Sequence, residues 1–295
     1  MNKSIFNENI NKISTPTINK LQKELDDHPI IVIAASHIDM AMLSELYNHL
    51  NNIGYQNTIN IVIYTRGGDI NAARRVALLI SDYCDHFNII APYYCQSSGT
   101  LLALAANTIY YSPLSIFSAI DPHLHGGQED NCAALSGADI KLFSKMSKEW
   151  FETEISPQSN MLGMLCEHIF PPTLTAFYRT VLEVKEIAHE LLQRAGKHKK
   201  NSQNNIIEAL MFSFHSHDYA VTGQQLEELT LPCINNNQIN AITWPIIEAF
   251  IDFIGGGNRA DLDSPWCDTI IVSSHRLASR WKDTSGLNPK WQINN

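Results

Sequence analysis

Apolar runs alternate with mixed segments over the first two-fifths of the chain. Continuous apolar stretches occupy residues 29–36 (PIIVIAAS), 58–65 and 88–94. Runs of this kind are typical of strands that are buried on both faces of a parallel sheet. The segments between them, 39–52 and 69–86, carry apolar positions at helical spacing. Alternating strands and helices predict a layered α/β domain.

The pattern changes beyond residue 121. Two short strands, TIYY (108–111) and SIFSAI (115–120), are expected before that point. Thr222 and Gln225 match a capping box, so a short helix is expected to begin there. An extended segment is expected around TIIVSS (269–274). Helical patterns occur at 135–153, 161–196, 203–214 and 241–254.

This organisation predicts three parts. Residues 1–28 form a polar leader and a helix, 29–232 form the main domain, and 233–295 form a helical and extended C-terminal region. The expected fold class is therefore α/β with a helical C-terminal region.

Ser97 stands where the chain must turn sharply, between the apolar run at 88–94 and helix-forming residues from Gly99. A serine at such a corner presents its hydroxyl at a helix N-terminus, where N–H groups favour a developing oxyanion. The alternative is that Ser97 and Ser98 are N-cap residues, a role that serines favour strongly.

The pair Gly67-Gly68 forms a second turn of this kind, after one buried strand and before the next helix. One of its N–H groups, together with the Ser98 N–H, could form a two-donor oxyanion hole. A phosphate-binding turn is the other reading, but neither G-x-G-x-x-G nor G-K-[ST] is present.

The motifs TRGGDINAARRVALLI, CQSSGTLLALAANTIYY and SAIDPHL resemble the ClpP/crotonase superfamily, and most closely its serine dehydrogenase proteinase branch near signal peptide peptidase A. Farther along, SHDYAVT (216–222) resembles that branch's T-H-D-Y-P-I-T segment. The resemblance implies a spiral of βαβ units and a serine peptidase that needs no metal and no cofactor. It implies that Ser97 is the nucleophile and that Gly68 and Ser98 are the oxyanion donors.

Three residues compete as the base that activates the serine. Lys141, in ADIKLF, stands where the resemblance to signal peptide peptidases implies a lysine partner. It could instead belong to a solvated basic stripe with Lys145 and Lys148. His217, in SHDYAVT, is the second candidate, because imidazole titrates near neutral pH. With Asp218 it could instead fix a loop by hydrogen bonds.

His123 is a third candidate, of lower rank. ClpP-type proteases place a histidine about this far beyond the serine, but closer relatives have glutamine at this position. A metal pair of His123 and His125 lacks a third ligand, so no metal site is predicted.

Composition limits the partners and the compartment. The net charge of −9 disfavours nucleic acid, and the six cysteines show no metal-ligand spacing. Neither a signal peptide nor an apolar run long enough to cross a bilayer is visible, so a cytoplasmic protein is expected.

A serine peptidase that acts on polypeptides is the leading interpretation, and a homo-oligomer (trimer or hexamer) is implied by analogy alone. Two alternatives remain open. One is a protease-like scaffold that has lost its base and binds peptides or partners. The other is a crotonase-type CoA-thioester enzyme, which the Ser-Ser-Gly-Thr turn disfavours because such enzymes need no nucleophilic serine.

Overall fold

Parallel strands form the centre of the fold, as the alternating pattern predicts. In the computed structural model they are β1 (Ile30–Ala35), β2 (Gln56–Thr65), β3 (Cys84–Ala91), β4 (Thr108–Tyr111) and β7 (Cys233–Asn235). They lie in that order, and each neighbouring pair is parallel. The structure describes residues 3–120, 123–124, 135–136, 142, 146, 149, 163, 165–167, 169–196, 199–214, 216–254, 265–283 and 290–294.

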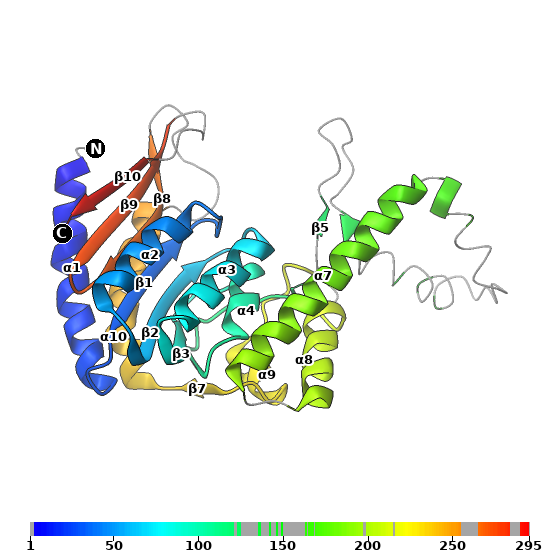
Figure 1. Ribbon diagram of the computed structural model, residues 1–295, viewed down its shortest axis with the longest axis horizontal. Coiled ribbons are helices and arrows are strands. Elements are labelled where there is room, and N and C mark those ends of the chain that lie inside the picture. The colour runs from blue at the N-terminus through cyan, green and yellow to red at the C-terminus, as the bar shows by residue number, and fades with distance from the viewer. Residues whose placement is uncertain are drawn as a thin grey trace.

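Antiparallel strands from the C-terminal region extend this sheet beyond β1. They are β8 (Trp266–Ser273), β9 (Arg276–Lys282) and β10 (Lys290–Asn294), and they give the order β10-β9-β8-β1-β2-β3-β4-β7. The expected extended segment at 269–274 is confirmed as most of β8, which pairs antiparallel with β1. The C-terminal region therefore shares the main sheet and its core (Figure 1).

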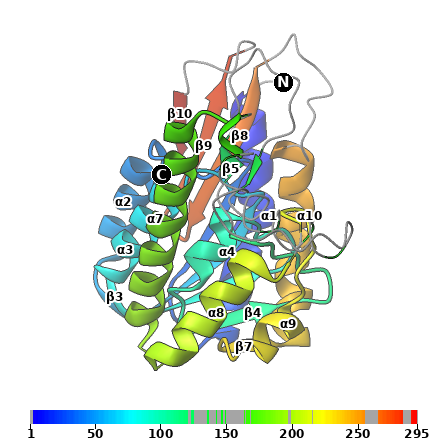
Figure 2. The same cartoon turned by 90° about the vertical axis from the view of Figure 1, so that its right-hand side faces the viewer.

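Helices cover both faces of the sheet. On one face, α1 (Lys3–Glu24) and α10 (Asn237–Ile254) lie side by side over β1 and β8 (Figures 1 and 2). The other face carries α2 (Met42–Ile53), α3 (Ile70–Ser81) and α4 (Ser98–Ala103). Helix α7 (Pro171–Ala195) packs against α3 and α4 and against α8 (Lys200–Phe212), whereas α9 (Gly223–Glu228) packs against β7.

Strand β1 shows why its sequence is apolar throughout. Successive side chains of a strand point to opposite faces. Ile31 and Ile33 belong to the core cluster under α2 and α3, whereas Ile30 and Val32 belong to the cluster under α1 and α10. All four side chains are buried, so each face of the sheet has its own apolar layer.

Several boundaries differ from the sequence prediction. Helix α1 begins at Lys3 and includes Pro16, so most of the expected polar leader is helical. Residues 115–120 form no regular strand, and only isolated bridges join Ile116 to Tyr94 and Phe117 to Val221. The capping box is confirmed: the Gln225 N–H donates to Thr222 Oγ1 at 3.2 Å, and α9 follows.

The expected helix at 135–153 is wrong at its start, where Leu135 and Ser136 form β6 (Leu135–Ser136) and pair with β5 (His123–Leu124). Most of that range lies outside the described residues. Among the helices that the structure does describe, none has the length and apolarity needed to span a membrane.

Candidate active site

The diglycine turn joins β2 to α3 and requires glycine at both positions. Gly67 has a φ of +114° and Gly68 a φ of +142°, values that L side chains rarely adopt. A Cβ added to Gly68 would also lie 2.2 Å from the backbone oxygen of Ile38. Glycine is needed here for its dihedral angle and for the close approach of a second backbone segment.

That second segment is the loop between β1 and α2. The Ile38 N–H donates to the Gly67 carbonyl at 2.8 Å, and the Ile38 carbonyl accepts from the Asp69 N–H at 2.9 Å. The peptide between Gly67 and Gly68 is trans, so its C=O and N–H point in opposite directions. Because Ile38 binds the C=O, the Gly68 N–H points away from Ile38.

Ser97 occupies the turn between β3 and α4 in a strained conformation. Its φ of 52° and ψ of −116° lie outside the regions favoured by non-glycine residues. Ser97 is the N-cap residue of α4, yet its side chain makes no capping hydrogen bond. The N-cap alternative therefore does not explain why a serine stands here. A strained residue at a strand-to-helix corner is the arrangement of a nucleophile elbow.

Two further hydroxyl groups hold this turn. The Ser97 N–H donates to Ser118 Oγ at 2.7 Å, and the Ser118 N–H donates to Thr100 Oγ1 at 3.1 Å. Thr100 Oγ1 in turn donates to the Cys95 carbonyl at 2.7 Å. All three of these partner residues are buried, so the main chain around Ser97 is fixed by the interior of the protein.

The two turns lie against each other. A Cβ added to Gly67 would lie 2.7 Å from Ser97 Cβ and 3.2 Å from Ser97 Oγ. Backbone bonds between Thr65 and the segment from Tyr94 to Gln96 hold the turns at this separation. Gly99 permits the approach as well, because a Cβ there would lie 2.6 Å from Thr65 Cγ2.

Two main-chain N–H groups at this junction, those of Gly68 and Ser98, have no hydrogen-bond acceptor in the described part of the chain. The Gly67 N–H differs, since it donates to Thr65 Oγ1 at 3.2 Å. Ser98 is the first residue of α4, and the first N–H groups of a helix lack an intrahelical acceptor. The junction thus presents one hydroxyl and two main-chain donors.

A cysteine next to Ser97 does not compete with it as a nucleophile. Burial raises the pKa of the Cys95 thiol well above its ordinary value, so the thiol stays protonated. At the neighbouring residue Tyr94, the Arg66 guanidinium lies 4.9 Å from the centre of the ring. The Asp69 carboxylate accepts from the Ala72 N–H at 2.7 Å and caps α3.

The part of the sequence that contains this junction is similar to a known protein family. Residues 21–140 match the family of ClpP-like SDH-type serine proteinases. The matched stretch contains both turns, and it confirms the resemblance to the serine dehydrogenase proteinase family that the sequence motifs indicated.

Two uncharacterised proteins of Methanocaldococcus jannaschii are similar to this chain. They are 25% identical over 179 residues and 24% identical over 178 residues. These matches cover 61% and 60% of this chain. The chain matches only about half of each relative, 52% and 54%.

Solved structures with a similar fold include proteases. A membrane-bound stomatin-specific protease is 16% identical, with a TM-score of 0.42, over 77% of this chain and 83% of its own. A variant of ClpP1 from Listeria monocytogenes is 14% identical, with a TM-score of 0.39, over 75% of this chain and 99% of its own.

The base candidates are less well placed than the serine. Lys141 lies outside the described residues, and of His123 only the backbone in β5 is described. His217 is half-buried in the turn after α8. Its segment reaches the site indirectly, because Val221 and Phe117 exchange two backbone hydrogen bonds of 2.9 Å next to Ser118. Within the described residues, Ser97 Oγ makes no hydrogen bond to a basic group.

Ile38, Thr100 and Ser118 were not predicted as site residues. Each holds one of the two turns by a hydrogen bond that joins its main chain or its hydroxyl group to a residue that is not its neighbour in the sequence. Their local sequence carries no motif, so only the folded structure identifies them.

Proposed function

We propose that this protein is a serine peptidase that forms an acyl-enzyme on Ser97. The observation that carries the proposal is the strained, non-capping Ser97, which lies against a diglycine turn with two available N–H donors. A strained backbone of this kind costs about 1–3 kcal/mol, which favours a functional reason for keeping it. The family match over residues 21–140 supports the same reading.

In the proposed reaction, Ser97 Oγ attacks the scissile carbonyl carbon while a base removes the hydroxyl proton. The carbonyl oxygen becomes negative and accepts hydrogen bonds from the Gly68 and Ser98 N–H groups. Each such donor typically contributes about 10²–10³-fold in rate. The base returns its proton to the leaving amine, and it then takes a proton from the water that hydrolyses the ester.

Lys141 and His217 remain the proposed bases, with His123 ranked below them. Substitution of a true general base lowers the rate by about 10²–10⁴-fold. Comparing Lys141→Met with His217→Gln therefore assigns the role to whichever variant loses reactivity without loss of stability.

Polypeptide is the proposed substrate, and assembly into a trimer or hexamer is proposed from the analogy with this fold. A reducing, cytoplasmic setting is also proposed. The five cysteines that the structure describes are all free thiols, which is compatible with such a setting.

A fluorophosphonate probe tests the proposal, since it reacts covalently with activated serines. We expect the full chain to be labelled and the Ser97→Ala variant not to be labelled. Ser44→Ala, which changes an exposed serine on α2, is the control and should label like the wild type.

Absence of labelling in a correctly folded wild-type protein would overturn the proposal. That result would favour the protease-like scaffold or the thioester enzyme. Labelling that persists in Ser97→Ala would assign the reactivity to another residue.

A further inference from the structure

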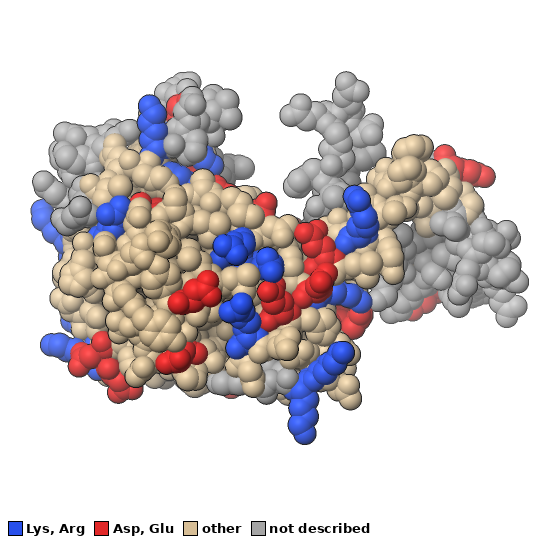
Figure 3. Space-filling view, in the orientation of Figure 1, with Lys and Arg blue, Asp and Glu red and all other residues tan. Residues whose placement is uncertain are grey.

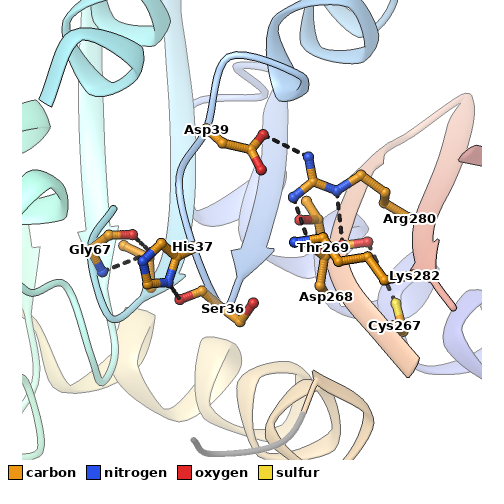
Figure 4. Close-up of polar contacts among 10 residues, drawn as sticks. Ser36, His37, Asp39, Gly67, Cys267, Asp268, Thr269, Arg280 and Lys282 are labelled. Carbon is orange, nitrogen blue, oxygen red and sulfur yellow. Dashed lines mark hydrogen bonds and ion pairs between the residues drawn. The ribbon is translucent and has the colours of Figure 1, made fainter. Parts of the chain in front are cut away.

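A fully buried arginine lies in the C-terminal hairpin. Arg280, on β9, is 0% exposed. Its Nε and Nη2 donate to the two carboxylate oxygens of Asp268, on β8, at 2.8 and 2.7 Å. Lys282 Nζ lies 2.8 Å from the same carboxylate (Figure 4). Two cations thus share one buried carboxylate.

A second carboxylate completes the cluster from outside the hairpin. Arg280 Nη1 donates to Asp39 Oδ1 at 2.6 Å. With Asp39 the cluster contains two cations and two anions, which a buried site requires. Burial alone would lower the pKa of Arg280, but the hydrogen bonds that it donates to Asp268 and Asp39 outweigh burial and raise the pKa. Arg280 is therefore a cation. Its Nε and Nη2 donate to Asp268, and its Nη1 donates to Asp39.

Asp39 lies in the loop between β1 and α2, which forms hydrogen bonds to the diglycine turn. The residue before it, Ile38, binds the Gly67 carbonyl and the Asp69 N–H on either side of Gly68. Figure 4 shows this loop passing from the Arg280 cluster on one side to Gly67 on the other. A single residue therefore separates the ion pair from the peptide that carries the Gly68 N–H.

We propose that Arg280 and Asp39 are positioning residues that fix the orientation of the Gly67–Gly68 peptide through Ile38. The C-terminal hairpin, which lies outside the family match, would thereby set the alignment of one oxyanion donor. The kinetic part of this inference rests on the proposed serine peptidase activity. Its structural part concerns the peptide orientation and can be measured without activity.

Asp39→Ala is the informative substitution. Its side chain is 35% exposed, and Arg280 keeps both bonds to Asp268, so we expect the variant to fold. We expect the rate of fluorophosphonate labelling at Ser97 to fall about tenfold, because a misaligned donor loses part of its stabilisation of the oxyanion. Asp39→Asn, which retains an acceptor oxygen, should restore part of the rate.

Lys282→Met is the matched control, because Lys282 contacts the same Asp268 but not Asp39. It should label within about twofold of the wild type. Amide hydrogen exchange of Ile38 and Asp69, followed by NMR, should accelerate in Asp39→Ala and not in Lys282→Met. Thermal unfolding of each variant separates a local effect from general destabilisation.

The outcomes are distinguishable. Unchanged exchange at Ile38 and Asp69 in Asp39→Ala overturns the inference, whatever the labelling shows. Faster exchange with unchanged labelling also overturns it, since the loop would then not serve the oxyanion donor. If the wild type is not labelled at all, the proposed activity fails, and the exchange result alone supports or overturns the coupling.

Discussion

At position 68 one added carbon atom is expected to disturb the site directly. Gly68→Ala places a Cβ 2.2 Å from the Ile38 carbonyl oxygen at a φ of +142°. The loop or the turn must move, at an expected cost of about 2 kcal/mol or more, and labelling at Ser97 should be lost.

Gly54 offers a matched control for this prediction. It also has a positive φ, +72°, but a Cβ there would meet no atom within 4 Å. With a ψ of −176°, Gly54→Ala is also strained, by about 1–3 kcal/mol, but it should leave labelling intact because it disturbs no contact of the site. The labelling rates of both variants provide the comparison, and equal loss of labelling would contradict the role given to Ile38.

Ser97 carries strain that glycine would release. At a φ of 52° and ψ of −116°, glycine is comfortable and alanine is not. Both Ser97→Gly and Ser97→Ala should be inactive. The free energy of unfolding of the glycine variant should be about 1 kcal/mol higher than that of the alanine variant. Urea denaturation of the two variants tests this, and a more stable alanine variant would argue against strain at this residue.

The positions of Ser97, Gly68 and Ser98 in strand-to-helix turns could be predicted, because those turns follow from the local sequence. Ile38, Ser118 and Asp39 could not, since their roles depend on contacts with residues 21 to 241 positions away. The base was not settled by the sequence for the same reason, because nothing local says which basic side chain the fold brings to Ser97.

At the scale of elements, a buried histidine joins α2 to β8. His49 Nδ1 lies 2.9 Å from Ser273 Oγ, and burial together with the positive charge of Arg276 lowers the pKa of His49 from 6.5 to about 3. Its Nε2 lies 3.5 Å from Glu45 Oε1, but no ion pair exists at neutral pH because the imidazole is neutral.

This histidine predicts a loss of stability in mild acid. Below pH 6.5 the unfolded chain binds a proton at this residue, whereas the native chain does not until about pH 3. The unfolded state binds more protons in that window, so stability falls as the pH falls, by roughly 2 kcal/mol between pH 6.5 and 4.5. Urea unfolding against pH should show a shallower decline for His49→Gln, and identical slopes would contradict the prediction.

The strands differ in how far their sequence predicts them. The apolar runs of β1, β2 and β3 identify them, because both faces of the sheet are covered. Strand β9 was not predicted, because Ser279 and Arg280 are fully buried there and break the apolar pattern. From the sequence alone, a buried arginine that is paired with a carboxylate cannot be distinguished from an exposed arginine.

Charged side chains on the surface also lie in opposite-sign groups. Figure 3 shows acidic and basic side chains interleaved across the face that carries α3 and α7, where Arg74 Nη2 donates to Glu190 Oε1 at 3.0 Å. Such half-exposed pairs contribute little to stability, and they give this face no large patch of one sign.

For the whole molecule, the matched family segment contains only part of the core that covers it. Buried side chains of both apolar clusters come from later elements, including Leu192 on α7, Phe250 on α10 and Ile271 on β8. A fragment of residues 21–140 would expose β1 as an edge strand and leave α3 and α4 without their cover.

We therefore expect this fragment to lack a cooperative unfolding transition and to bind the dye ANS, whereas the full chain unfolds cooperatively. Near-UV circular dichroism and ANS fluorescence provide the comparison. A fragment that melts cooperatively would show that the later elements are dispensable for folding.

The hydroxyl groups of Ser118 and Thr100 have one more consequence. Because they hold the main chain at Ser97 before any substrate arrives, the proposed nucleophile needs no ordering at the moment of reaction. A dormant form of such an enzyme would have to be created elsewhere, by withholding the proton acceptor. Activation would then require that a basic side chain moves to within hydrogen-bond distance of Ser97, whose surroundings are already ordered.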